Sequence, residues 1–456
     1  FNYKDYCINI LDTPGHQDFS EDTYRTLMAA DSAVMVIDAS KGVEAQTIKL
    51  FKVCVMRHIP IFTFINKMDR DARDTFELLD DIETVLGIKT CPVNWPIGSG
   101  KEFKGVYDRK TKIVSTFQAI STGGAKKAEE TDYHIDDEAL KELVGPYLFD
   151  QFNEEIELID GATEEMDIEK VRAGELSPVF FGSALNTFGI EQFLNYFLKM
   201  TTPPIGRNSS EGIIDPVTEP FSAFVFKIQA NMNKAHRDRI AFMRICSGKF
   251  EAGMEVYHAA SKRKIKLSQP QQLMAQDRKI VDEAYAGDVI GVFDPDLFSI
   301  GDTLTTGGKK FEYEGIPTFA PEHFCRVVQL NSMKRKQFVK GVTQIAQEGA
   351  IQIFQEYTAG LSEIIVGVVG VLQFDVLKYR LENEYGCEIR LEPIPYNYIR
   401  WVKDPTIDVT KLKRVSDVKK VKDMKGNPLL LFANEWVIDQ VLQHNEGLEL
   451  EEFRKN

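Results

Sequence analysis

The first group of residues whose types and spacing could do chemistry lies near the N-terminus, directly after the apolar stretch 6–11. It consists of Asp12, Thr13, Pro14, Gly15 and His16. A carboxylate at the end of a parallel strand can hold Mg²⁺ through a water molecule, because Mg²⁺ keeps several of its own waters. A glycine lets the backbone approach a phosphate and offer its N–H, and the histidine after it could position an attacking water. An aspartate followed by a turn is common, so this group needs support from its neighbours.

The second group is Asn66, Lys67, Met68 and Asp69, which follows the apolar stretch 61–65. Guanine presents two adjacent donors, N1–H and an exocyclic amine, and the single carboxylate of Asp69 can accept both. Adenine would leave that charge unpaired, which disfavours it. Asn66 carries a donor and an acceptor, so it can reach the purine and tie loops together, and the stem of Lys67 can lie across the base. The pattern favours guanine recognition.

The third group is Ser183, Ala184 and Leu185, which follows Gly182 and the apolar stretch 179–181. A small turn of this kind can bring a backbone N–H to the guanine oxygen, although such turns are frequent. The three groups occur in this order, each directly after an expected strand. Together they predict a site for GTP and GDP, with Mg²⁺ bound through Asp12.

No Gly-x-x-x-x-Gly-Lys-[Ser/Thr] loop occurs in the chain. Such a loop cradles the phosphates with backbone N–H groups and supplies a lysine and a hydroxyl that binds Mg²⁺. We expect it one strand and one helix before Tyr3, so that this chain carries an incomplete site and hydrolyses GTP only as part of the intact protein. The alternative is a chain that does not hydrolyse GTP.

The segments 12–16, 66–69 and 183–185 each follow an expected strand of a doubly wound α/β domain, which would position them at one edge of its sheet. Near-continuous apolar stretches at 6–11, 33–38, 61–66 and 179–182 are typical of parallel strands buried on both faces, and helical patterns alternate with them. We therefore expect a P-loop-type GTPase domain over 1–205, incomplete at its N-terminus. An acidic insertion at 121–174 interrupts it, with expected helices at 136–144 and 147–159.

The remainder of the chain changes character twice. Residues 206–218 have the composition of a linker. Short strands separated by glycine turns predict an antiparallel β-barrel over 219–315. From 316 to 456 the pattern predicts β-α-β-β-α-β, the split βαβ arrangement, followed by a tail with a helix near 436–443.

These motifs and domains resemble the translational GTPases and, within them, the class II peptide chain release factors. The barrel is then like the second domain of elongation factor Tu. The similar stretches are 12–38, 59–70, 93–100, 177–190, 224–248 and 367–386. The resemblance implies that Gly15 senses the γ-phosphate and that His16 orients the hydrolytic water, while Asn66, Lys67 and Asp69 read guanine with help from 183–185. It also implies a GTPase that promotes dissociation and recycling of class I release factors on the ribosome. The alternatives are a translocase like elongation factor G and a non-hydrolysing ribosome-binding module.

Composition limits the other functions. The net charge is −14, with 43% hydrophobic residues, which argues against a general nucleic-acid coat protein. Basic clusters within 262–266, 334–340 and 411–425 are either solvated faces or contacts to ribosomal RNA. No apolar run approaches the roughly 20 residues of a membrane span, and scattered cysteines are typical of reduced thiols. We expect a cytoplasmic monomer that has no membrane contact.

Overall fold

The computed structural model describes residues 1–14, 18, 20–118, 129–230, 239–267, 271–274, 277–316, 319–357, 364–413 and 417–452. It divides into two compact units, of which the first comprises Phe1–Ile8 and Ala30–Pro203, and the second Asn9–Ala29 and Pro204–Asn456. Each unit is described separately below. No helix in the described ranges has both the length and the apolar character that a membrane crossing requires.

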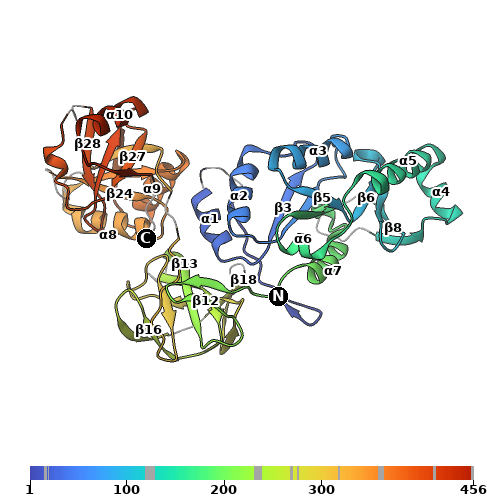
Figure 1. Ribbon diagram of the computed structural model, residues 1–456, viewed down its shortest axis with the longest axis horizontal. Coiled ribbons are helices and arrows are strands. Elements are labelled where there is room, and N and C mark those ends of the chain that lie inside the picture. The colour runs from blue at the N-terminus through green and yellow to red at the C-terminus, as the bar shows by residue number, and fades with distance from the viewer. Residues whose placement is uncertain are drawn as a thin grey trace. The chain divides into compact units, whose positions relative to one another are not determined.

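The first unit contains a parallel sheet with strand order β3-β4-β10-β5, flanked by helices (Figure 1). β4 and β10 are almost entirely buried, because parallel strands are covered on both faces. The sheet strands are β3 (Ala33–Asp38), β4 (Ile61–Asn66), β5 (Lys89–Pro92) and β10 (Leu176–Phe181). The helices are α2 (Ala45–Met56), α3 (Thr75–Leu86), α6 (Ile168–Arg172) and α7 (Ile190–Met200). The doubly wound arrangement agrees with the pattern of apolar stretches.

One expected strand is wrong. The segment 6–11 does not join the parallel sheet, and only β2 (Tyr6–Cys7) is extended, pairing antiparallel with β1 (Asn2–Tyr3). The parallel sheet ends at β3 on this side, where the side chains of Val34 and Val36 are 45% and 59% exposed. Burying an apolar strand requires packed layers on both of its faces. Beyond β3 the described residues supply no such layers. The apolar character of segment 6–11 was therefore not sufficient to place it in the parallel sheet.

An antiparallel sheet with order β6-β7-β8-β9 begins soon after β5, earlier than the insertion expected from composition. Its strands are β6 (Asn94–Ile97), β7 (Gly105–Asp108), β8 (Ile113–Gln118) and β9 (Glu129–His134). The two helices expected within the insertion are present as α4 (Glu138–Val144) and α5 (Pro146–Ala162). The Trp95 indole donates to Glu155 over 2.8 Å, which fastens α5 to β6.

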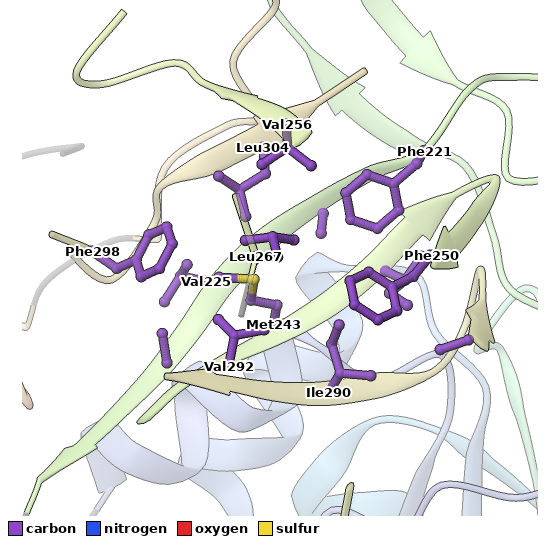
Figure 2. Close-up of a cluster of buried hydrophobic side chains, with 14 of the residues drawn as sticks. Phe221, Val225, Met243, Phe250, Val256, Leu267, Ile290, Val292, Phe298 and Leu304 are labelled. Atoms are coloured by element: carbon purple, nitrogen blue, oxygen red, sulfur yellow. The ribbon is translucent and has the colours of Figure 1, made fainter. Parts of the chain in front are cut away.

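The barrel of the second unit is an antiparallel sheet with order β17-β16-β22-β13-β14-β21-β18-β19. Its core contains the Phe221 and Phe250 rings, with centroids 6.0 Å apart, and aliphatic side chains from several strands (Figure 2). The strands of this sheet are β13 (Ser222–Ala230), β14 (Arg239–Ser247), β16 (Glu255–His258), β17 (Arg263–Lys266), β18 (Gln271–Met274), β19 (Asp277–Ile280), β21 (Val289–Phe293) and β22 (Thr303–Thr305). β15 (Lys249–Glu251) and β20 (Glu283–Tyr285) pair with each other in a separate two-stranded sheet. Within the segment expected as a linker, β11 (Arg207–Ser209) and β12 (Gly212–Ile214) form a hairpin.

The C-terminal part of the second unit has the predicted β-α-β-β-α-β order, and its tail extends the same sheet to β26-β23-β25-β24-β28-β29-β27-β30. The split βαβ elements are β23 (His323–Gln329), α8 (Arg335–Gln347), β24 (Gln352–Glu356), β25 (Ile364–Val368), α9 (Leu372–Asn383) and β26 (Ile389–Pro393). The tail contributes β27 (Tyr398–Val402), β28 (Val418–Lys422), β29 (Pro428–Phe432), α10 (Glu435–His444) and β30 (Leu450–Glu451). The second unit also includes α1 (Ser20–Met28), which contacts β13.

Candidate guanine-nucleotide site

The carboxyl ends of three neighbouring parallel strands bring the predicted base-reading residues together. Asp38 at the end of β3 lies in register with Asn66 at the end of β4, and Phe181 of β10 lies beside Ile65. The loops that follow these strands therefore leave the sheet at one edge, where open α/β folds bind their ligands. The groups around Asn66 and Ser183 meet there, as their positions in the sequence predict.

Asn66 fastens the two loops to each other. Its Oδ1 accepts one hydrogen bond from the backbone N–H of Lys67 and a second from that of Ala184, both over 2.8 Å. A further bond joins the N–H of Met68 to the carbonyl of Gly182 over 3.2 Å, and Met68 is fully buried. With its oxygen occupied, the Asn66 side chain has its amide group left to donate. The site edge is thus held in shape by contacts within the protein.

Lys67 is fixed by a residue that sequence reasoning missed. Its Nζ donates to Asp38 Oδ2 over 2.6 Å, and its backbone is left-handed, with φ of 70°. Burial raises the pKa of Asp38, but hydrogen bonds from Lys67 and Ser40 outweigh that effect and lower the pKa to about 2. The signal that could have found Asp38 is its place at the end of an expected strand neighbouring the one before Asn66.

The carboxylate of Asp69 has no hydrogen-bond or ion-pair partner among the described residues. It is partly buried, and no donor or cation of the described ranges bonds to it. The turn that carries it is closed by a bond from the N–H of Arg70 to the carbonyl of Lys67 over 3.0 Å. A partly buried carboxylate with no partner is suited to accept a pair of external donors, because pairing restores the hydrogen bonds that burial has removed.

The three residues of the turn after β10, Ser183, Ala184 and Leu185, make different contacts. Ser183 is fully buried and exchanges backbone bonds with Phe188, and the N–H of Ala184 is used by Asn66. Leu185 has a 73% exposed side chain, and its N–H donates to no group within the described ranges. In this turn the N–H of Leu185 is therefore the backbone donor that remains available among the described residues, while Ser183 and Ala184 shape the turn.

The motif near the N-terminus belongs to the other compact unit. Asp12 is exposed, and the carbonyl of Pro14 accepts a hydrogen bond from Thr23 Oγ1 over 3.2 Å. Thr13 is partly buried between them. Gly15 and His16 lie outside the described residues. No cluster of three or more His, Cys, Asp or Glu residues suited to a metal ion occurs in the described ranges.

Comparison with known proteins agrees with this architecture. Residues 1–203 match the family model described as elongation factor Tu GTP binding domain, and residues 220–307 match elongation factor G domain 2. A crystal structure of a protein from Thermus thermophilus shares the fold, with a TM-score of 0.66 at 21% identity; the match covers 88% of this chain and 60% of that one. The fold and these domains are those of a translational GTPase.

The particular family follows from the C-terminal part and from whole-chain similarity. Residues 313–442 match the model described as class II release factor RF3, C-terminal domain. The chain is 54% identical to peptide chain release factor 3 of Symbiobacterium thermophilum, over 98% of this chain and 84% of that protein. It is 50% identical to the protein of the same name from Microcystis aeruginosa, over 99% of this chain and 82% of that one. The chain belongs to the release factor 3 family.

Proposed function

We propose that this chain binds GTP and GDP and, in the intact protein, hydrolyses GTP to promote dissociation and recycling of class I release factors from the ribosome. Family membership supports the termination role. The observation that carries nucleotide binding is the loop pair fastened by Asn66, whose Oδ1 accepts from the N–H groups of Lys67 and Ala184. This arrangement leaves the carboxylate of Asp69 and the N–H of Leu185 available at one edge of the sheet.

Base recognition follows from the groups that remain available. The Asp69 carboxylate accepts N1–H and the exocyclic amine of guanine, and the Leu185 N–H donates to the guanine oxygen. The ion pair with Asp38 directs the ammonium end of Lys67, so that its aliphatic stem can lie across the base. Ser183 and Ala184 hold the turn that presents Leu185. Adenine would leave the Asp69 charge unpaired, which is the source of selectivity.

The hydrolytic roles rest on the motif 12–16. Asp12 would hold Mg²⁺ through water, and its exposed single carboxylate fits an ion that keeps most of its own waters. Mg²⁺ when bound supplies charge neutralisation at the phosphates. Thr13 and Pro14 set the backbone path into Gly15, whose N–H senses the γ-phosphate. His16 orients the attacking water once ribosomal RNA has positioned the side chain.

The organisation and setting form part of the same proposal. The domains are a GTPase domain at 1–205, a linker at 206–218, a β-barrel at 219–315 and a split βαβ domain with its tail at 316–456. We propose a cytoplasmic monomer with no membrane contact, whose partners are the ribosome and, indirectly, class I release factors. The GTP turnover of an elongation factor G-like translocase would also be stimulated by ribosomes, so the test must separate factor dissociation from translocation.

The experiment uses the protein expressed from its complete gene. GTP turnover is measured with and without ribosomes, and dissociation of a labelled class I factor is followed on ribosomes after peptide release. Ribosome-stimulated turnover together with accelerated dissociation supports the proposal; translocation of peptidyl-tRNA without factor dissociation identifies a translocase. Turnover that ribosomes leave unchanged would refute the hydrolytic role.

The Asp69→Asn variant tests base reading directly. Xanthine carries an oxygen where guanine carries the exocyclic amine, so an amide at this position should pair with xanthine instead. We expect GDP affinity to fall by about 100-fold and preference to shift to XDP. Asp71→Asn, an exposed carboxylate two positions along the chain, is the matched control. An Asp69→Asn protein with unchanged preference would remove Asp69 from the base site.

A further inference from the structure

The segment that follows the hydrolysis motif is held by charged contacts from the barrel and from the C-terminal domain. On the barrel side, Asp22 of α1 forms an ion pair with Lys227 of β13 over 2.9 Å. At the C-terminal end of α1, the Arg207 guanidinium donates to the carbonyl of Met28 over 2.8 Å. A cation is favourable at that end of a helix, where the unpaired carbonyls carry partial negative charge. Both ends of the α1 segment are therefore bonded to other parts of the same compact unit.

Asp18 serves as the missing N-cap of helix α9. The residue at the N-cap position is Val371, which has no side-chain oxygen and makes no capping bond. Asp18, which is only 6% exposed, supplies the acceptor instead: its Oδ2 takes a hydrogen bond from the N–H of Leu372 over 2.8 Å. A carboxylate is the favoured partner for helix N-terminal amides. This cap comes from 354 residues away in the chain.

The start of α9 is built to admit this carboxylate. A Cβ on Gly370 would lie 2.3 Å from Asp18 Cγ, a distance no side chain tolerates, so the glycine makes the approach possible. The adjoining amides of Val369 and Gly370 are both satisfied by Gln373 Oε1 over 3.0 Å. Asp18 accordingly receives an amide of this turn that Gln373 does not reach.

Arg25 makes the opposite contact at the end of helix α8. Its Nη2 donates to the carbonyl of Gly349 over 3.1 Å, directly after the last turn of that helix. The same guanidinium pairs with Glu21 over 2.5 Å, and both side chains are almost fully buried. The α1 segment thus offers a carboxylate to a helix N-terminus and a cation to a helix C-terminus, and each charge matches the helix end it touches.

We infer that Asp18 is a positioning residue for the hydrolysis switch: by capping α9, it makes the C-terminal domain set the backbone path at residues 12–14, where the motif begins. The link back to the motif is the bond from Thr23 of α1 to the carbonyl of Pro14. The inference rests on the proposed hydrolytic function of that motif. Movement of the C-terminal domain on the ribosome then reaches the motif through the Asp18 and Arg25 contacts.

The contact itself is tested by hydrogen exchange on the protein expressed from its complete gene, without nucleotide. Asp18→Ala should accelerate exchange in the first turn of α9 by about tenfold, because that turn loses its cap. Asp18→Asn keeps an acceptor and should restore most of the protection. Asp375→Ala removes an exposed acid from the same turn of α9 and should leave exchange at the α1 segment unchanged. Unaltered exchange in Asp18→Ala would overturn the inference.

The positioning role is tested by turnover. Asp18→Ala should lower ribosome-stimulated kcat by about tenfold with GDP affinity unchanged. Gly370→Ala should do the same from the other side, by forcing the carboxylate away, and the double variant should be no slower than either single one. If the wild-type protein is stimulated by ribosomes and Asp18→Ala matches it, the positioning role is wrong. If the wild type shows no stimulation, the proposed function fails, while the exchange result still decides whether the cap exists.

Discussion

Replacing Asn66 with alanine separates the loop-fastening role of this side chain from contact with the base. The Asn66 oxygen accepts from the N–H groups of Lys67 and Ala184, both over 2.8 Å. Loss of each bond costs about 1 kcal/mol, so about 2 kcal/mol is lost from the ordered form of the loops. If nucleotide binding must restore that order, the affinity for GDP falls by about 30-fold.

The matched variant is Asn66→Asp, which keeps an oxygen for both backbone N–H groups but removes the amide donors. It should retain the ordered loops and lose only the contact made by the amide, so its affinity should fall by about tenfold. Titration of a fluorescent GDP analogue measures both variants, and circular dichroism melting checks the fold. The bonds lie at the edge of the sheet, so the melting temperature should change little. An Asn66→Ala protein that binds GDP as tightly as the wild type would refute the fastening role.

Three further perturbations test other parts of the molecule. His16→Ala should lower ribosome-stimulated turnover by about 100-fold while GDP affinity stays within a factor of two, measured by phosphate release and titration; a large loss of affinity would contradict a water-orienting role. Lys67→Met should raise the pKa of Asp38 from about 2 towards its ordinary value, followed by carboxyl NMR. The pKa of Asp38 is lower in the folded protein than its value near 4 in the unfolded chain, so the ionised carboxylate stabilises the fold above about pH 4. This stability is lost as the pH falls from about 4 towards 2, and the wild type should therefore lose more stability than Lys67→Met across this window. Phe250→Ala should destabilise the barrel by about 3–5 kcal/mol in denaturant unfolding, since the ring is fully buried (Figure 2), whereas Val217→Ala, at an 87% exposed side chain, should be neutral.

The sequence predicted those parts of the fold that depend on local pattern. The order of strands and helices from β23 to β26 and the presence of α4, α5 and α10 all follow from hydrophobic periodicity. The segment 6–11 was misassigned because an apolar stretch becomes a buried strand only when neighbouring layers cover it. In the tail, β27 to β30 extend an existing sheet, and such pairing depends on partners far apart in sequence.

In the candidate site, too, local patterns could be predicted from the sequence, whereas contacts between distant residues could not. Asn66 and Asp69 are predicted because their types and order suffice to suggest guanine, and the turn 183–185 is predicted from its place after a strand. Asp38 was missed because its function is to hold Lys67, and a single aspartate at a strand end carries no pattern of its own. Long-range partners of this kind become visible only when the strand register is known.

The base-reading loops and the hydrolysis motif are stabilised by different parts of the chain, and this makes their effects separable. The base-reading loops are held by bonds among Asp38, Asn66, Lys67 and Ala184, all within the first compact unit. The motif 12–14 and helix α1 are held within the second unit, through contacts such as that of Asp18. Loosening the second set removes no bond from the first. Variants of the α1 segment should therefore change the rate of hydrolysis without changing the choice of base, and variants of the base-reading loops should do the reverse.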